Sequence, residues 1–211
     1  MASVGHALGA TRPNAGRPRD GMSADAAVLR TVLWLSEQEP GSEYVVLWRT
    51  AKGYRVHGDW VGSVDRAPSR AWYQLDIDDG WGVQRLRAAW RTPTALARLH
   101  LHYETDGGWR VNGQMRPDLT GCRDIDLAWS PLTNTLPIRR LGLAVGEQQE
   151  ISVAYIAGPR LGVVPDGQRY TRVAARRWRY ESLDTAFVAE LTVDDEGLVL
   201  AYPPLFRRGA S

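Results

Sequence analysis

Apolar and polar residues alternate along most of the chain with the period of a β-strand. Within residues 71–78, for example, Tyr73, Leu75 and Ile77 fall on one face and Gln74 falls on the other. Such alternation predicts half-buried antiparallel strands. Further strand-like segments occupy residues 31–35, 43–50, 54–64, 150–157, 168–175, 177–183, 186–193 and 198–202.

Three short acidic segments separate pairs of these strands. Residues 78–81 (DDGW), 105–109 (TDGGW) and 194–197 (DDEG) combine aspartate with glycine, and both residue types favour tight turns. We therefore expect hairpins at all three places. The predicted fold class is mainly β: a single domain built as a curved antiparallel sheet or a partly open barrel, with few short helices. A helix is most favoured near residues 131–141.

The two ends of the chain differ in pattern. Residues 1–30 contain scattered glycine, proline and arginine without apolar periodicity, so we expect a disordered or weakly ordered tail. Residues 31–208 then form the β domain. A length of 211 residues fits one domain with such a tail.

Composition narrows the classes of partner. The chain carries 26 basic and 24 acidic side chains, and four of the former and two of the latter lie in residues 1–30, leaving 22 of each in the rest. The zero net charge of residues 31–211 argues against nucleic-acid binding, which needs basic charge to neutralise phosphates. No apolar run approaches the roughly 20 residues of a membrane-spanning helix, and no secretory signal is recognised near the start. With a single cysteine, this pattern favours a cytoplasmic protein without a transmembrane segment.

A polar stretch between residues 121 and 141 interrupts the strand pattern. Asp124 and Asp126 share a strand face, whereas the adjacent Arg139 and Arg140 diverge, so one arginine can meet the aspartates. We expect these groups and Asn134 to form one connected polar cluster. The cluster either anchors the hydroxyl groups of a ligand or is a structural network that holds an irregular connection in place.

Other candidate chemistry is weaker. His100 and His102 lie two apart on a strand, but no third ligand accompanies them, which favours an exposed strand face over a metal site. Cys122 has no obvious base nearby in the sequence and is interpreted as a buried structural thiol. Phosphate-binding loops, nucleophile elbows and zinc-protease motifs are not found in the sequence, so we predict no metal and no cofactor.

Three motifs carry a resemblance to a known family. The segments GCRDIDL (121–127), TNTLPIRRL (133–141) and QRYT (168–171) resemble the bacterial family of putative glycolipid-binding proteins, an uncharacterised group, and the similarity extends from about Thr31 to Arg208. The resemblance implies a β-rich fold similar in shape to lipoprotein-carrier proteins, whose concave faces hold acyl chains. The candidate site residues are then Asp124, Asp126, Thr133, Asn134, Thr135, Arg139, Arg140, Gln168 and Tyr170.

The leading functional hypothesis is noncovalent binding of a small amphipathic ligand, a glycolipid by the resemblance. Tryptophan offers a large apolar face with a polar N–H, which suits such a groove. One alternative is an enzyme that acts on a lipid-like substrate with Asp124 or Asp126 as acid or base. Another is a scaffold for protein interaction. The oligomeric state stays open. The tryptophans considered for the groove are Trp48, Trp60, Trp72, Trp81 and Trp90.

Overall fold

The described part of the protein is one large β-sheet with a single α-helix. The computed structural model describes residues 27–105 and 107–209. The expected tail, apart from residues 27–30, lies outside these residues. The elements are β1 (Ala27–Ser36), β2 (Gly41–Thr50), β3 (Gly53–Val64), β4 (Ala67–Ile77), β5 (Val83–Arg91), β6 (Leu96–Tyr103), β7 (Trp109–Val111), β8 (Gln114–Met115), the 3₁₀ turn η1 (Pro117–Leu119), β9 (Cys122–Leu127), α1 (Leu132–Leu141), β10 (Gln148–Ala157), β11 (Gly162–Ala174), β12 (Arg177–Ser182), β13 (Val188–Val193), β14 (Val199–Tyr202) and β15 (Phe206–Arg208).

The strand order shows how the sheet is connected. From one edge to the other it runs β8-β7-β6-β5-β4-β3-β2-β1-β15-β14-β13-β12-β11-β10-β9. Neighbours pair antiparallel except β9 and β10, which pair in parallel and are joined by α1. A parallel pair needs such a crossover, because a tight hairpin cannot return the chain in the same direction. The β9 and β8 edges are not paired with each other within the described residues, so the sheet does not close into a barrel.

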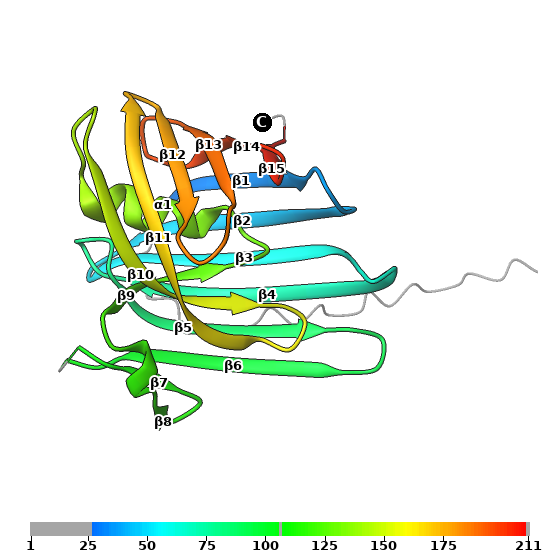
Figure 1. The fold of residues 1–211 in the computed structure, drawn as a ribbon. Helices are drawn as coiled ribbons and strands as arrows, with labels where there is room; N and C mark the ends of the chain where they lie inside the picture. The colour runs from blue at the N-terminus through cyan, green and yellow to red at the C-terminus, as the bar shows by residue number, and fades with distance from the viewer. Residues whose placement is uncertain (1–26, 106, 210–211) are drawn as a thin grey trace, which may run out of the picture.

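The sheet curves so that its two halves, β1–β8 and β9–β15, enclose a common core. In Figure 1, β10–β12 cross in front of β1–β6, and α1 lies between the two halves. Side chains tie the halves together: Trp34 Nε1 on β1 donates to the Val199 carbonyl at 2.8 Å, and Trp109 Nε1 on β7 donates to the Cys122 carbonyl at 2.7 Å. Because helix and strand residues from both halves share this core, the concave face is where a site can form.

Sequence and structure agree on the architecture. A mainly β fold, a curved open sheet and one short helix at residues 132–141 are confirmed, as are the hairpin turns that follow Asp78 and Asp194. Two details differ. Strand β1 begins at Ala27, four residues before the expected domain boundary, and the β9–β10 pair is parallel. No helix in the described ranges is long and apolar enough to cross a membrane.

Candidate functional site

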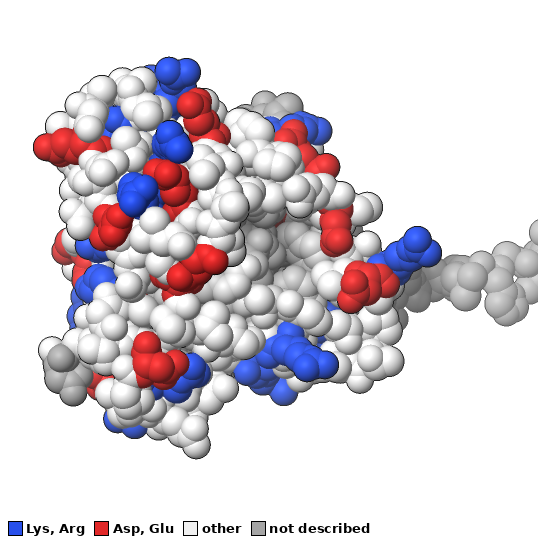
Figure 2. Space-filling model, viewed as in Figure 1, with Lys and Arg blue, Asp and Glu red and all other residues white. Residues whose placement is uncertain are grey.

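A cleft opens on the concave side where the two halves of the sheet face each other. Figure 2 shows a hollow in the middle of the molecule, with mostly uncharged side chains around it. The cleft has a volume of about 500 Å³. Its walls come from the end of β9, the start of α1, strands β10–β12, the β12–β13 loop and the β14–β15 turn. The lining residues used below are Asp126, Ser130, Asn134, Tyr155, Asp166, Tyr180, Ser182, Thr185, Tyr202 and Phe206.

Asp126 is the anchor of a hydrogen-bonded network on the polar wall. The Thr133 hydroxyl donates to Asp126 Oδ1 at 2.9 Å, and Gln168 Nε2 donates to Asp126 Oδ2 at 2.8 Å. The same Gln168 nitrogen donates to Asp166 Oδ2 at 3.0 Å, so one amide bridges two carboxylates. Gln168 is buried, whereas both aspartates are half-buried and reach the cleft. The carboxylates are therefore held in place before any ligand arrives.

The network continues through the helix to a buried tyrosine. Asn134 Nδ2 donates to Tyr170 Oη at 2.9 Å, and the Tyr170 hydroxyl lies 3.4 Å from Gln168 Oε1. The Thr133 hydroxyl also lies 3.0 Å from the Ser130 carbonyl oxygen. The first turn of α1 thus places Thr133 and Asn134 directly against β9 and β11, and the network links the consecutive elements β9 and α1 to β11, which follows later in the chain.

The titratable groups of the cleft are shifted towards their neutral forms. Burial raises the pKa of Asp126, and the hydrogen bonds from Gln168 and Thr133 oppose that shift. Burial likewise raises the pKa of Asp166, aided by the neighbouring Asp184. Burial also raises the pKa of Tyr180 and Tyr202, so both phenols stay protonated and can donate hydrogen bonds. The cleft therefore offers acceptors and donors without a fixed positive charge.

A second, more apolar pocket of about 230 Å³ adjoins the cleft. The two share Gln38, Ala128, Leu205 and Phe206 as lining residues. Three tryptophans line the second pocket. The ring centroids of Trp60 and Trp90 are 5.1 Å apart, and those of Trp90 and Trp129 are 5.0 Å apart at a nearly perpendicular angle. The Nε1 atoms of Trp90 and Trp129 are buried without a hydrogen-bond partner among the described residues.

Glycine makes room for this tryptophan cluster. A Cβ at Gly158, which follows β10, would overlap the six-membered ring of Trp90. Gly158 also lines the pocket itself. The backbone after β10 therefore packs directly onto the indole, and a larger residue there would displace the Trp90 ring.

A buried carboxyl group lies on the inner face of β2. Glu43 is 1% exposed and accepts a hydrogen bond from Tyr73 Oη at 2.8 Å. Tyr73 Oη is also 3.0 Å from Ser130 Oγ, and Ser130 lines the cleft. Burial raises the pKa of Glu43 to about 8 against the opposing effect of the Ser130 and Tyr73 hydroxyls. Sequence reasoning missed Glu43, although it shares a strand face with the buried Val45 and Leu47.

The residues proposed from the sequence form two hydrogen-bonded groups among the described residues, where one was expected. Asp126, Thr133, Asn134, Gln168 and Tyr170 make the network at the cleft. Asp124 is fully buried and pairs instead with Arg140, whose Nη2 is 2.5 Å from Asp124 Oδ2 and whose Nε is 3.0 Å from Oδ1. Neither member of this pair lines the cleft.

The two remaining candidates lie apart from both groups. Arg139 is exposed, donates to the Glu196 carbonyl at 3.3 Å and lies over the Trp81 ring at 4.9 Å. Thr135 is fully buried in α1, and its hydroxyl has no hydrogen-bond partner among the described residues. Neither residue lines the cleft.

The other sequence candidates are also placed. Of the five tryptophans considered, Trp60 and Trp90 line the apolar pocket. Trp48 packs on His57, Trp81 packs on Tyr54, and Trp72 is exposed on the outer face. Trp129, a sixth, completes the pocket. Cys122 is buried, and burial raises the pKa of its thiol to about 11. The described residues contain no group of three or more His, Cys, Asp or Glu side chains arranged to hold a metal ion.

Comparisons with known proteins identify relatives of the chain. The family described as "Putative glycolipid-binding" matches residues 31–208. Among solved structures, the crystal structure of a DUF1089 family protein from Pseudomonas aeruginosa is similar, with a TM-score of 0.73 and 36% sequence identity over 79% of this chain and 92% of that one. A comparison with curated proteins finds no match.

Proposed function

The chain belongs to the family described as putative glycolipid-binding, and on this premise we propose that it binds an amphipathic molecule, a glycolipid, noncovalently in the cleft. The observation that carries the proposal is the pairing of two adjoining pockets of opposite character. One is walled by carboxyl, amide and hydroxyl groups, and the other by tryptophan rings. A ligand with a polar head and an apolar tail fits such a pair.

The polar pocket suits a headgroup rich in hydroxyl groups. Asp126 and Asp166 accept hydrogen bonds, and Asn134, Ser182 and the tyrosine hydroxyls can donate or accept them. The rings of Tyr180, Phe187 and Tyr202 provide flat apolar surface beside these groups, with centroids about 6 Å apart. Because Thr133 and Gln168 already hold Asp126, little ordering is needed when a headgroup binds.

The tryptophan pocket suits the apolar tail. Trp60, Trp90 and Trp129 are almost entirely buried, and their edges and faces surround the space beside Val64 and Phe206. An alkyl chain there gains roughly 0.8 kcal/mol for each CH₂ group removed from water. The tail therefore supplies affinity and the headgroup network supplies selectivity.

Ligand titration tests this proposal. We expect a long-chain alkyl glucoside and a diacyl glycolipid to shift the tryptophan emission of the protein, because both bring apolar groups against Trp60, Trp90 and Trp129. The affinity should depend little on salt, since no fixed positive charge lines the cleft. Mass spectrometry of the intact complex gives the stoichiometry. No change with any glycolipid or fatty acid would favour the scaffold hypothesis.

Blocking the cleft should abolish this binding. Thr185 is exposed on the β12–β13 loop and lines the cleft, so Thr185→Trp places a large ring at its mouth. We expect calorimetry to show at least about tenfold weaker glycolipid binding, a loss of roughly 1.4 kcal/mol. Thr94→Trp, in the β5–β6 turn away from the cleft, is the matched control. Equal affinities of the two variants would place the ligand elsewhere.

The headgroup network should determine selectivity. Asp126→Asn removes a charged acceptor but keeps the shape of the side chain. We expect the affinity for the alkyl glucoside to fall about tenfold or more, as for loss of a hydrogen bond to a charged group, with little change for a free fatty acid. Competition calorimetry with both ligands measures the difference. Equal losses for both would remove Asp126 from headgroup recognition.

One observation favours a second function, catalysis on a lipid-like substrate. Asp126 and Asp166 are bridged by one amide, and burial raises the pKa of both, which is the setting of a general acid. Incubation with the glycolipid, followed by mass spectrometry of the lipid fraction, separates the two functions. A product formed by the parent protein and lost in Asp126→Asn would establish an enzyme.

A further inference from the structure

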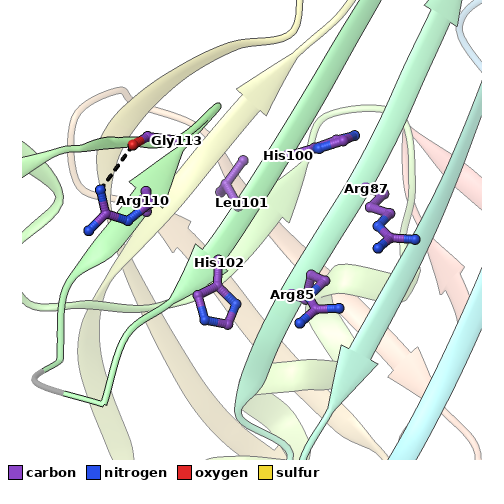
Figure 3. A pocket seen from close by; sticks show the side chains of 7 residues that line it. All are labelled: Arg85, Arg87, His100, Leu101, His102, Arg110 and Gly113. Atoms are coloured by element: carbon purple, nitrogen blue, oxygen red, sulfur yellow. Dashed lines mark hydrogen bonds between the residues drawn. The ribbon is translucent and has the colours of Figure 1, made fainter.

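The outer face of β5 and β6 gathers positive charge, on the side of the sheet away from the cleft. Arg85, Arg87 and Arg91 project from β5, and Arg98 projects with His100 and His102 from β6. In the register of these strands Arg85 is opposite His102, and Arg87 is opposite His100. Figure 3 shows these four side chains projecting from neighbouring strands beside a shallow pocket of about 310 Å³. We call Arg85, Arg87, Arg91, Arg98, His100 and His102 the basic face.

The four arginines of the basic face have no acidic partner within the described part of the chain, whereas His102 lies 4.0 Å from the Glu104 carboxylate. Arg85, Arg87, Arg91 and Arg98 form no ion pair or hydrogen bond there, and all four are exposed. The nearby acids are already engaged by other arginines. Those ion pairs are Asp76 with Arg55 at 2.7 Å, Asp59 with Arg70 at 2.7 Å and Glu104 with Arg110 at 2.8 Å. The basic face therefore carries a local excess of positive charge, although basic and acidic side chains are equal in number over residues 31–211 as a whole.

Exposed apolar side chains border the basic face on the same side of the sheet. Trp72 on β4 is 42% exposed and lies opposite Ala89, which in turn is opposite Arg98. Tyr44 on β2 is 51% exposed and Val61 on β3 is 55% exposed. In the register Asp59 lies between Tyr44 and Trp72, and Val61 is opposite Arg70, so exposed apolar and charged side chains alternate on this face. Large exposed apolar groups beside a charged surface indicate an interaction site.

We propose that this outer face docks on a membrane surface that contains anionic lipids. Arginines are attracted to the negative potential of such a surface, and tryptophan and tyrosine rings suit the headgroup region. A nucleic acid would also attract the arginines, but Val61 adds nothing to contacts with a phosphate backbone, whereas it gains from a lipid boundary. The proposal is independent of the cleft, because it involves the opposite face of the sheet and different residues.

Vesicle sedimentation of the full chain tests the docking surface. The full chain should sediment with vesicles of phosphatidylcholine mixed with phosphatidylglycerol, and much less with phosphatidylcholine alone. Arg85→Gln with Arg87→Gln should lower the partition coefficient about 25-fold, roughly fivefold for each arginine near an anionic surface. Arg160→Gln with Arg177→Gln removes the same charge from exposed positions elsewhere and should change it by less than about twofold.

Further measurements separate this surface from the cleft and from other partners. These vesicles contain no glycolipid, so Thr185→Trp should sediment like the parent protein. Trp72→Ser should weaken binding further without changing the circular dichroism spectrum. The proposal fails if the parent does not bind anionic vesicles, or if the control pair loses as much binding as the Arg85 and Arg87 pair. It also fails if a single-stranded oligonucleotide binds the parent and displaces it from the vesicles, which would assign the face to nucleic acid.

Discussion

Arg140→Met is expected to lower the free energy of unfolding by about 3–5 kcal/mol, the range seen when a buried carboxylate loses its partner. Asp124 on β9 is fully buried, and its hydrogen-bond partner in the described structure is the Arg140 guanidinium. Methionine matches the apolar stem of arginine but leaves the carboxylate without compensation. Urea unfolding followed by tryptophan fluorescence at neutral pH measures the loss.

Replacing Arg140 and replacing Asp124 should not cost the same free energy of unfolding. The Arg140 side chain is 23% exposed, so it can still meet water when Asp124 is replaced. We therefore expect Asp124→Asn to cost less, about 1–2 kcal/mol, and the double variant to lose less than the two single variants added together. Arg139→Met is the matched control on the same helix and should cost under about 1 kcal/mol, because Arg139 is exposed. An Arg140→Met cost no larger than that control would show that water or another cation compensates Asp124.

This pair also shows how far sequence reasoning extends. The shared face of Asp124 and Asp126, beside two diverging arginines, predicted that one arginine meets an aspartate, and Arg140 does. The pattern could not decide which aspartate it meets. That choice depends on how α1 crosses from β9 to β10, and the parallel register of those strands is a long-range property. Asp126 is left facing Thr133 and Gln168 instead.

The sequence also could not show which face of each strand lines the cleft. Alternation shows that a strand has two faces, but only the pairing shows which face is concave. Trp60 is opposite Ala71, which is opposite Trp90, so all three point inward and Trp72 points outward. Tyr155, Asp166 and Tyr180 enter the cleft from strands whose order in the sheet no local pattern contains. The fold class was thus predictable, and the local motifs named Asp126 and Asn134 of the cleft, whereas the lining residues contributed by β10, β12 and the β14–β15 turn were not predicted.

Glu43 leads to the second large effect, a stability that falls as the pH rises. In the folded protein burial raises the pKa of Glu43 from 4.5 to about 8, whereas the unfolded chain has the ordinary value. Between these two pH values the folded state binds the extra proton, so the free energy of unfolding decreases with pH. Below pH 4.5 both states are protonated and the residue adds no pH dependence. Above pH 8 the full cost of burying the carboxylate is present, on the order of 5 kcal/mol.

Glu43→Gln should remove this pH dependence. Glutamine keeps the size of the side chain and an oxygen that accepts the hydrogen bond from Tyr73, but it cannot ionise. We expect the variant and the parent to unfold at similar urea concentrations at pH 5, and the variant to be more stable by about 3–5 kcal/mol at pH 9. The exposed Glu190→Gln on β13 serves as the control and should follow the parent at every pH.

The difference between the parent and Glu43→Gln isolates this residue, because all other titrating groups are common to both proteins. If the two curves stay parallel from pH 5 to pH 9, Glu43 ionises in the folded state as easily as in the unfolded chain. Water would then have to reach the Oε2 atom of Glu43, which has no hydrogen-bond partner among the described residues, past Tyr73 and Ser130. If the curves diverge as expected, the carboxyl group is neutral at physiological pH. The neutral carboxyl group then lies between Trp34 and Trp60, its neighbours on the two paired strands, and adds no charge to the core.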